Sequence, residues 1–329
     1  SIDHNLYTRG GGGNFPRNVS LSVMSGVEKG EYFDVTPFAH EVSRYLMGQI
    51  TTYKLPRKLK IAFSSSDRDD SNATLNDLGF MATVKDGQPF FRLFIAGGLG
   101  GNPAPSLHYD KLVEPKDILY HVEAMTQLFM AEGDYQNRAK ARTRYIPRRM
   151  GVEAFFECYE KHLAEVKTKL NLDVNIPVEL STTLEKYNHT LKEDSCIIPQ
   201  RQDNLYSMVL HPLNGQLLST TFKTLVEFLD RNPNCEARLS MNENIYVRNL
   251  TEEQIKELLE LTKDVRMSNK VQQSVSCIGV PTCQMGIEQS QKLLSNILSY
   301  LKESNIPEEY IPSIHISGCQ NSCARHQVN

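Results

Sequence analysis

The sequence predicts an α+β protein with a small α+β unit in its C-terminal half, and three observations lead to this prediction. Strand-like apolar runs alternate with segments whose apolar residues recur at helical spacing. Two strands and two helices alternate within about 205–265, which is typical of a small α+β unit. Two close pairs of cysteines near the C-terminus flank a probable helix, which indicates shaped loops between regular elements.

The N-terminal half contains three expected helices and two expected strands. The segment PFAHEVSRYLMG, at 37–48, is typical of a helix that ends at its last glycine. KLKIAFS, from Lys58, and PFFRLFIAGG, which runs into a glycine-rich turn at 97–101, are typical of strands. Helical apolar spacing predicts two further helices, over 116–132 and 152–171.

The C-terminal half has LYSMVLH and EARLSMNENIYVR as expected strands, with the helix TTFKTLVEFLDR between them. Thr251 and Gln254 form a capping box for the next helix, TEEQIKELLELTK. After Cys283, the expected helix QMGIEQSQKLLSNILSYLKE has six apolar residues on one face. They are Met285, Leu293, Leu294, Ile297, Leu298 and Leu301. SIHIS, from Ser313, is an expected short strand before the last cysteines.

The composition is that of an ordinary globular protein. Of 329 residues, 40% are hydrophobic and 23% are charged, and the net charge of -3 argues against a globally basic nucleic-acid-binding protein. No apolar run approaches the ~20 residues that span a bilayer, and the first residues lack the layout of a signal peptide. The odd number of cysteines, 7, argues against a fully disulfide-paired secreted protein. We therefore expect a cytoplasmic protein that binds neither nucleic acid nor a membrane.

The C-terminal cysteines have a pattern typical of a metal site. They form a C-x5-C pair, Cys277 and Cys283, and a C-x3-C pair, Cys319 and Cys323. Four thiolates are the usual ligands of a [4Fe–4S] cluster, whereas zinc sites usually use C-x2-4-C spacing. Because soft thiolates suit both metals, a zinc site stays open as an alternative. Four buried cysteines without a metal are a further alternative.

A basic segment, NRAKARTRYIPRRM, lies between the second and third expected helices. Its cations, with few acidic residues among them, are Arg138, Lys140, Arg142, Arg144, Arg148 and Arg149. Further basic positions beside expected strands or glycine turns are Arg17, Arg57, Lys58 and Lys60. Many such charge runs are solvated helix faces. Clustered guanidinium groups also pair well with carboxylates and phosphates, so we expect a polyanionic ligand near an iron–sulfur cluster.

Short motifs in a fixed order give the chain a family resemblance. They are FPRNV at 15–19, LPRKLK at 55–60, NDLGF at 76–80, AGGLG at 96–100, NRAKAR at 137–142, SMNENI at 240–245, and the two cysteine pairs. In this order they resemble the sirohaem-dependent nitrite/sulfite reductases, almost from end to end of the chain. The resemblance implies a tandem-duplicated architecture, with mixed α/β sirohaem-binding units and a small ferredoxin-like α+β unit.

The same resemblance implies five segments. They are the end of a first ferredoxin-like half-domain at 1–20, a first sirohaem-reductase α/β domain without a cluster at 21–175, a linker at 176–204, a second ferredoxin-like half-domain at 205–268, and the start of the [4Fe–4S]/sirohaem domain at 269–329. Both ends of the family fold are absent from this sequence. We therefore expect the middle of a longer protein, which binds sirohaem poorly and is inactive as this chain alone.

Two cofactors are implied, a [4Fe–4S] cluster and sirohaem. The resemblance implies that Cys277, Cys283, Cys319 and Cys323 hold the cluster and that Cys323 also bridges to the sirohaem iron. Sirohaem has several carboxylates, which gives the basic segment a partner. The residues implied to bind it are Arg138, Lys140, Arg142, Arg144, Asn242 and Asn244.

The resemblance implies Arg17, Lys58 and Lys60 as catalytic residues. Fixed positive charge favours an oxyanion, and lysine ammonium groups can supply protons. The implied activity is the six-electron reduction of sulfite to sulfide. Sulfite is favoured because the family's nitrite reductases tend to have Asn at the second position of the Lys-x-Lys pair. Nitrite reduction to ammonia stays an alternative, as do an iron–sulfur electron-transfer protein without haem and a zinc-stapled binding protein.

The electron donor is a separate protein in this interpretation. The glycine turn at 97–101 lacks the G-x-G-x-x-G spacing of a dinucleotide site. We therefore expect a ferredoxin or a flavoprotein subunit as the donor.

Overall fold

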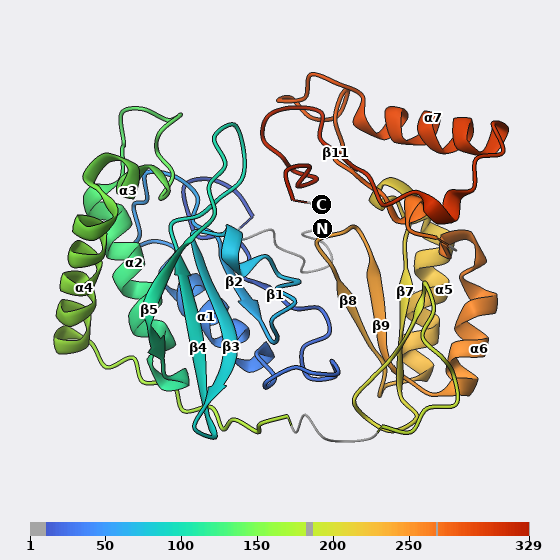
Figure 1. The fold of residues 1–329 in the computed structure, drawn as a ribbon, viewed down its shortest axis with the longest axis horizontal. Coiled ribbons are helices and arrows are strands. Elements are labelled where there is room, and N and C mark those ends of the chain that lie inside the picture. The colour runs from blue at the N-terminus through green and yellow to red at the C-terminus, as the bar shows by residue number, and fades with distance from the viewer. Residues whose placement is uncertain (1–10, 182–186, 268, 329) are drawn as a thin grey trace. The chain divides into compact units, whose positions relative to one another are not determined.

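The computed structural model describes residues 11–181, 187–267 and 269–328 (Figure 1). The chain forms two compact units, Ser1–Gly98 with Pro103–Thr183 and Leu99–Asn102 with Leu184–Asn329. Parts of the segments predicted above lie outside the described residues. They are the first ten residues of the predicted N-terminal half-domain, 182–186 of the predicted linker, and the last residues of the two C-terminal segments, 268 and 329.

The first unit contains a five-stranded mixed sheet in the order β1-β2-β3-β4-β5. The strands are β1 (Ser20–Leu21), β2 (Ile61–Ser64), β3 (Leu78–Lys85), β4 (Gln88–Ile95) and β5 (Leu107–Val113). The first three run parallel, and β4 and β5 are antiparallel to their neighbours. Asp86 and Gly87 join β3 to β4, both with positive φ, as a tight two-residue hairpin requires.

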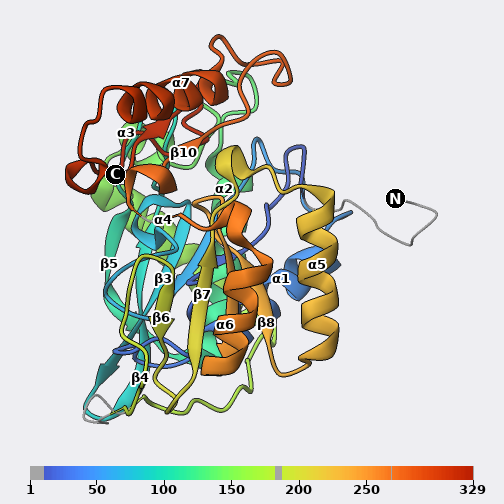
Figure 2. The ribbon, with the colours of Figure 1, turned by 90° about the vertical axis from the view of Figure 1, so that its right-hand side faces the viewer.

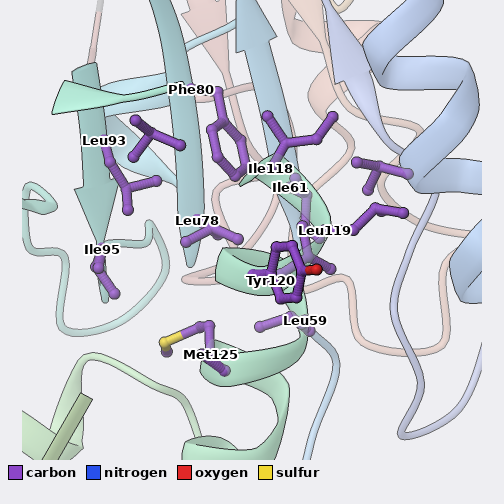
Figure 3. Close-up of a cluster of buried hydrophobic side chains, with 14 of the residues drawn as sticks. Leu59, Ile61, Leu78, Phe80, Leu93, Ile95, Ile118, Leu119, Tyr120 and Met125 are labelled. Carbon is purple, nitrogen blue, oxygen red and sulfur yellow. The ribbon is translucent and has the colours of Figure 1, made fainter. Parts of the chain in front are cut away.

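The described residues of this unit form the helices α1 (Thr36–Gly48), α2 (Ile118–Glu132), α3 (Tyr145–Met150) and α4 (Val152–Lys169). Helix α2 is buried along most of its length, because it packs against both the sheet and α4. Figure 3 shows Leu78 and Phe80 of β3 in the same cluster as Ile118 and Met125 of α2. The apolar face of the sheet and the apolar helix α2 therefore form one core.

Phe91 of β4 lies at the centre of an aromatic group in this core. Its ring meets those of Phe33, Phe38, Phe63 and Phe80 edge to face, at centroid distances between 5.2 and 5.8 Å. All five side chains are buried. This geometry suits the quadrupoles of aromatic rings and adds to the free energy of burial.

The second unit contains a four-stranded antiparallel sheet in the order β6-β7-β9-β8. The strands are β6 (Ile197–Pro199), β7 (Tyr206–Leu210), β8 (Glu236–Leu239) and β9 (Ile245–Leu250). Helices α5 (Ser219–Arg231) and α6 (Glu252–Leu261) pack on one face of this sheet (Figure 2). The predicted capping box is confirmed, because the Thr251 side chain accepts from the Gln254 N–H and Gln254 accepts from the Thr251 N–H.

A strand–helix–strand segment follows in the second unit. It consists of β10 (Val275–Ser276), α7 (Ser290–Glu303) and β11 (His315–Ile316). The two strands pair in parallel, Val275 with His315 and Ser276 with Ile316. No helix in the described parts of the chain is long and apolar enough to cross a membrane.

Two predictions for the second unit are wrong. EARLSMNENIYVR is two strands rather than one, because the chain turns at 240–244, where Glu243 has a positive φ. The helix after Cys283 begins only at Ser290, so Met285 lies outside it and is 68% exposed. On the predicted apolar face, Leu294 and Leu301 are buried and Leu293 is exposed.

In the first unit, strands β3 and β5 were not predicted. For β3 the reason is that both of its faces are buried, so its apolar residues do not alternate with polar ones.

We predict that Phe91→Ala lowers the free energy of unfolding by about 3–5 kcal/mol, as expected when a large core ring is replaced by a methyl group. Denaturant unfolding measures the change. Phe90→Ala is the matched control, because Phe90 is the neighbouring residue of the same strand and is only partly buried. Equal losses in the two variants would contradict the central place of Phe91 in the core.

Candidate functional site

One buried carboxylate connects two basic motifs of the first unit. Asp77 is fully buried and accepts hydrogen bonds from the Lys60 N–H at 2.8 Å and from Arg142 Nη2 at 2.7 Å. It also accepts a hydrogen bond from the Thr143 hydroxyl. LPRKLK, NDLGF and NRAKAR, which are distant in the sequence, therefore meet at one side chain.

Lys58 lies among other cations. Burial lowers the pKa of Lys58 to about 8, together with the positive charges of Lys60, Arg142, Arg17 and Arg57. The three residues predicted to be catalytic, Arg17, Lys58 and Lys60, are therefore brought together. We call this group, with Arg57 and Arg142, the basic cluster.

Backbone pairing brings Arg17 to the basic cluster. The Arg17 N–H donates to Leu59 O at 2.8 Å, and Pro16 forms a parallel bridge with Leu59. The Arg17 guanidinium donates to Gly13 O at 3.0 Å and also to Gly11 O. FPRN therefore lies beside LPRKLK as a short extension of the parallel sheet.

The residues predicted to bind sirohaem in NRAKAR differ in their surroundings. Arg138 is exposed, and its charge helps to lower the pKa of Arg57, after burial as the main cause. Arg144 is buried and lies 5.0 Å from the centre of the Tyr145 ring. Burial, then the charge of Arg142, lowers the pKa of Arg144. Lys140 is exposed.

The glycine turn leaves room for two of these guanidinium groups. A Cβ built on Gly98 would lie 3.1 Å from Arg144 Nη1 and 3.6 Å from Arg142 Nη2. Gly98 also has a positive φ of 153°. A side chain at Gly98 would crowd the Arg144 guanidinium, whereas its contact with Arg142 would be ordinary, so the AGGLG motif leaves space chiefly for Arg144.

The chemistry of the basic cluster suits an anion. Several like charges gathered in a partly desolvated place attract a small oxyanion or the carboxylates of a larger ligand. Among the described residues, Asp77 is the buried carboxylate that pairs with Arg142, and its side chain is 0% exposed.

The cysteine pairs of the second unit follow two paired strands. Cys277 comes directly after β10, and its N–H donates to Ile316 O of β11 at 3.0 Å. Cys319 comes three residues after Ile316. Since the carboxyl ends of parallel strands meet at one edge, both pairs begin at the same place.

Contacts between the two cysteine loops are close. The Gly318 N–H donates to Cys277 Sγ at 3.1 Å. A Cβ on Gly318 would lie 3.4 Å from Gly279 Cα and 2.7 Å from Glu288 O. A Cβ on Gly279, whose φ is +53°, would lie 2.6 Å from the same carbonyl. Both glycines are therefore required by the packing of the loops.

The four thiols fit an iron–sulfur cluster in donor chemistry and in loop placement. None of the seven cysteines, all within the described ranges, forms a disulfide. Across the same ranges, no three His, Cys, Asp or Glu side chains are gathered as ligands of one metal ion. A cluster held by these four thiols would draw their side chains together as it binds, as is usual where metal binding is coupled to local folding.

Asn242 and Asn244, also predicted to bind the cofactor, take part in hydrogen bonds within the second unit. Asn242 Oδ1 accepts from Arg325, which follows the last cysteine by two residues. The Asn244 side chain contacts His211 Nδ1, and His211 Nε2 contacts Ser274 O at 3.2 Å. The 240–244 turn thereby supports both cysteine segments.

Sequence reasoning missed two residues of these sites. Asp77 belongs to the NDLGF motif, but no role was predicted for it. An acidic residue in a motif that accompanies basic motifs is a signal for an internal ion pair. Ser290 was placed within a helix, yet its hydroxyl lies 3.2 Å from Cys277 Sγ. No pattern in the sequence indicates the latter contact.

Two family descriptions match the chain. "Nitrite and sulphite reductase 4Fe-4S domain" matches residues 12–167, and "Nitrite/Sulfite reductase ferredoxin-like half domain" matches residues 198–265. The first matched segment contains a single cysteine, Cys158, and the two cysteine pairs lie C-terminal to both segments. The family indicates a [4Fe–4S] cluster and sirohaem as cofactors.

Curated relatives agree with these matches. The chain is 25% identical over 325 residues to "Sulfite reductase [ferredoxin] 1" of Mycolicibacterium paratuberculosis, covering 96% of this chain and 56% of that protein. It is 27% identical over 324 residues to "Ferredoxin--nitrite reductase, chloroplastic" of Zea mays, covering 95% and 55%. The chain therefore spans about half the length of the curated relatives it matches.

A solved structure shows the same fold. The "Structure of Mycobacterium tuberculosis NirA protein" superposes with a TM-score of 0.76 at 22% identity, covering 95% of this chain and 56% of that one. The predicted fold class, with mixed α/β units and a ferredoxin-like α+β unit, is confirmed by this likeness. The ordered motifs, both domain matches and the fold agree, and the chain belongs to the sirohaem-dependent nitrite/sulfite reductase family.

Proposed function

We propose that the protein reduces sulfite to sulfide with six electrons, at a sirohaem coupled to a [4Fe–4S] cluster. The observation that supports this most is the basic cluster, where Lys58 lies among four other cations and its pKa is lowered to about 8. Such a concentration of charge is costly to fold and is explained by an anionic ligand. A haem-free electron-transfer protein has no need of it.

The proposal assigns Cys277, Cys283, Cys319 and Cys323 to the cluster and makes Cys323 the bridge to sirohaem. Arg138, Lys140, Arg142, Arg144, Asn242 and Asn244 are assigned to the sirohaem carboxylates. When bound, the two cofactors supply the redox centre that receives the electrons. The protein contributes binding, orientation and protons.

Arg17, Lys58 and Lys60 hold the substrate oxyanion in this proposal. Their fixed charges favour the anion over water and stabilise the negative charge that accumulates during reduction. With a pKa of about 8, the Lys58 ammonium is mostly protonated at neutral pH and is a better acid than an ordinary lysine. It is therefore suited to give a proton to an oxygen that leaves as water.

The wider assignments follow the family. We propose the five segments 1–20, 21–175, 176–204, 205–268 and 269–329 as pieces of its duplicated architecture. A ferredoxin or a flavoprotein subunit is proposed as the electron donor, and the cytoplasm as the location. The names of the Mycolicibacterium paratuberculosis and Zea mays relatives specify ferredoxin as donor, and that of a Vibrio atlanticus relative, "Sulfite reductase [NADPH] hemoprotein beta-component", specifies NADPH.

The absorption spectrum of the anaerobically purified full-length gene product tests the proposal. We expect sirohaem bands that change on reduction and again on addition of sulfite. A broad iron–sulfur shoulder without haem bands would contradict the haem assignment. Zinc in place of iron would contradict both cofactors.

For substrate choice, we predict that Lys60→Asn lowers kcat/KM for sulfite about tenfold more than kcat/KM for nitrite, a difference of about 1.4 kcal/mol in transition-state binding. Lys60 supplies the second charge of the Lys-x-Lys pair. Steady-state assays with both anions measure the ratio. Lys54→Asn is the matched control, since Lys54 is an exposed lysine just before the same motif. Equal losses for both anions would remove the argument for sulfite that rests on Lys60.

For pH dependence, we predict that sulfite kcat/KM falls as the pH rises through about 8. The Lys58 ammonium is the active form and loses its proton in that range, because burial and neighbouring cations lower its pKa. In Lys58→Arg the charge persists to much higher pH, so the alkaline decline should disappear. Lys85→Arg, at an exposed strand end, serves as control. An unchanged alkaline limb in Lys58→Arg would exclude Lys58 as its source.

A further inference from the structure

Two strand–helix–strand segments of this chain have the same register. Helix α1 connects the parallel strands β1 and β2, and α7 connects the parallel strands β10 and β11. The Ser22 N–H donates to Phe63 O at 2.9 Å, just as the Cys277 N–H donates to Ile316 O at 3.0 Å. Ser22 and Cys277 therefore occupy the same place in two repeats.

The repeats also share a donor to that side chain. The Ser65 N–H donates to Ser22 Oγ at 3.2 Å, and the Gly318 N–H donates to Cys277 Sγ at 3.1 Å. Phe63 precedes Ser65 by as many residues as Ile316 precedes Gly318. One backbone donor thus faces this position whether it holds a hydroxyl or a thiol.

Ser290, the first residue of α7, contacts Cys277 twice. Its side chain is fully buried, its hydroxyl donates to Cys277 O at 2.6 Å, and its oxygen lies 3.2 Å from Cys277 Sγ. In the first repeat the same count from Ser22 leads to Val35, and α1 begins one residue later, at Thr36. The contacts of the Ser290 hydroxyl with Cys277 are therefore the observation that singles it out.

Both cysteine loops leave space for this hydroxyl. A Cβ on Gly279 would lie 2.4 Å from Ser290 Oγ, and a Cβ on Gly318 would lie 3.3 Å from it. A larger residue at Gly279 would displace the hydroxyl from Cys277. The glycine of the C-x5-C loop and the serine of α7 therefore belong to one arrangement around Cys277 Sγ.

We propose that Ser290 is a positioning residue that donates its hydroxyl hydrogen bond to the Cys277 sulfur when that sulfur ligates the cluster. This rests on the proposed function, because it takes Cys277 as a ligand. As a thiol, Cys277 has a proton to share with Ser290 Oγ, whose own proton goes to Cys277 O. On ligation the S–H bond breaks and its proton leaves to solvent, so the hydroxyl turns from the carbonyl to the thiolate. Hydrogen bonds to ligand sulfurs favour the reduced cluster.

The test is the midpoint potential of the cluster in the full-length gene product, measured by an anaerobic redox titration followed by electron paramagnetic resonance. In Ser290→Ala we expect the equilibrium constant for one-electron reduction to fall about tenfold, a shift of about 59 mV to lower potential. Ser290→Thr keeps the hydroxyl and should keep the wild-type potential. Ser295→Ala is the matched control, because the Ser295 hydroxyl donates to Gln291 O at 3.0 Å within the same helix.

Each outcome either supports or overturns the role proposed for Ser290. If Ser290→Ala has the potential of Ser295→Ala, the proposal is overturned. If Ser290→Ala is folded by circular dichroism but holds no cluster, loading of Ser290→Thr supports the proposal. Failure of both variants assigns Ser290 a packing role and overturns it. If the wild-type protein itself holds no iron–sulfur cluster, the proposed function is wrong, and this inference falls with it.

Discussion

The first unit depends on how like charges are kept together. Two unit charges 4 Å apart repel by about 4 kcal/mol at the effective dielectric of a protein surface. Asp77 offsets part of this repulsion, since its buried carboxylate binds Arg142 and the backbone of Lys60 at once. It is placed by the sheet, because it lies immediately before β3, between the parallel neighbour β2 and the antiparallel neighbour β4. The mixed sheet therefore both supports the cations and supplies their counter-charge.

The second unit contains the two cysteine pairs, which lie in distant parts of the sequence. Parallel pairing of β10 and β11 starts both cysteine loops at one edge, and Gly279 and Gly318 let the loops touch. The thiols themselves are not gathered as ligands in the described structure. If the four cysteines hold the cluster as proposed, the backbone of the loops is arranged in advance and the thiol side chains move last, as the metal binds.

Much of the fold could be predicted from the sequence, because it depends on local patterns. The predictions of a helix over 37–48 and of a capping box at Thr251 are confirmed, because apolar spacing and capping residues are local features of the sequence. The turn at 240–244 was missed because it has neither Gly nor Pro and its φ > 0 residue is Glu243. Arg17, Lys58 and Lys60 were predicted to be catalytic from the family resemblance alone. Their proximity depends on the backbone pairing of Arg17 with Leu59, which only the structure shows. Ser290 could not be identified, since its contact with Cys277 depends on three-dimensional packing alone.

The repeated strand–helix–strand segment has a consequence for how the protein is made. In the first repeat the positions that match the four cysteines are Ser22, Glu28, Ser66 and Asp70, counted from the shared register. There the buried Glu28 accepts a hydrogen bond from Ser66 at 3.1 Å and pairs with Arg68 at 3.3 Å. These bonds form from the polypeptide alone as soon as it folds. If the four cysteines hold the cluster as proposed, iron supply acts on only the second repeat, and a cell short of iron would accumulate protein in which the first repeat is complete and the second lacks its cluster.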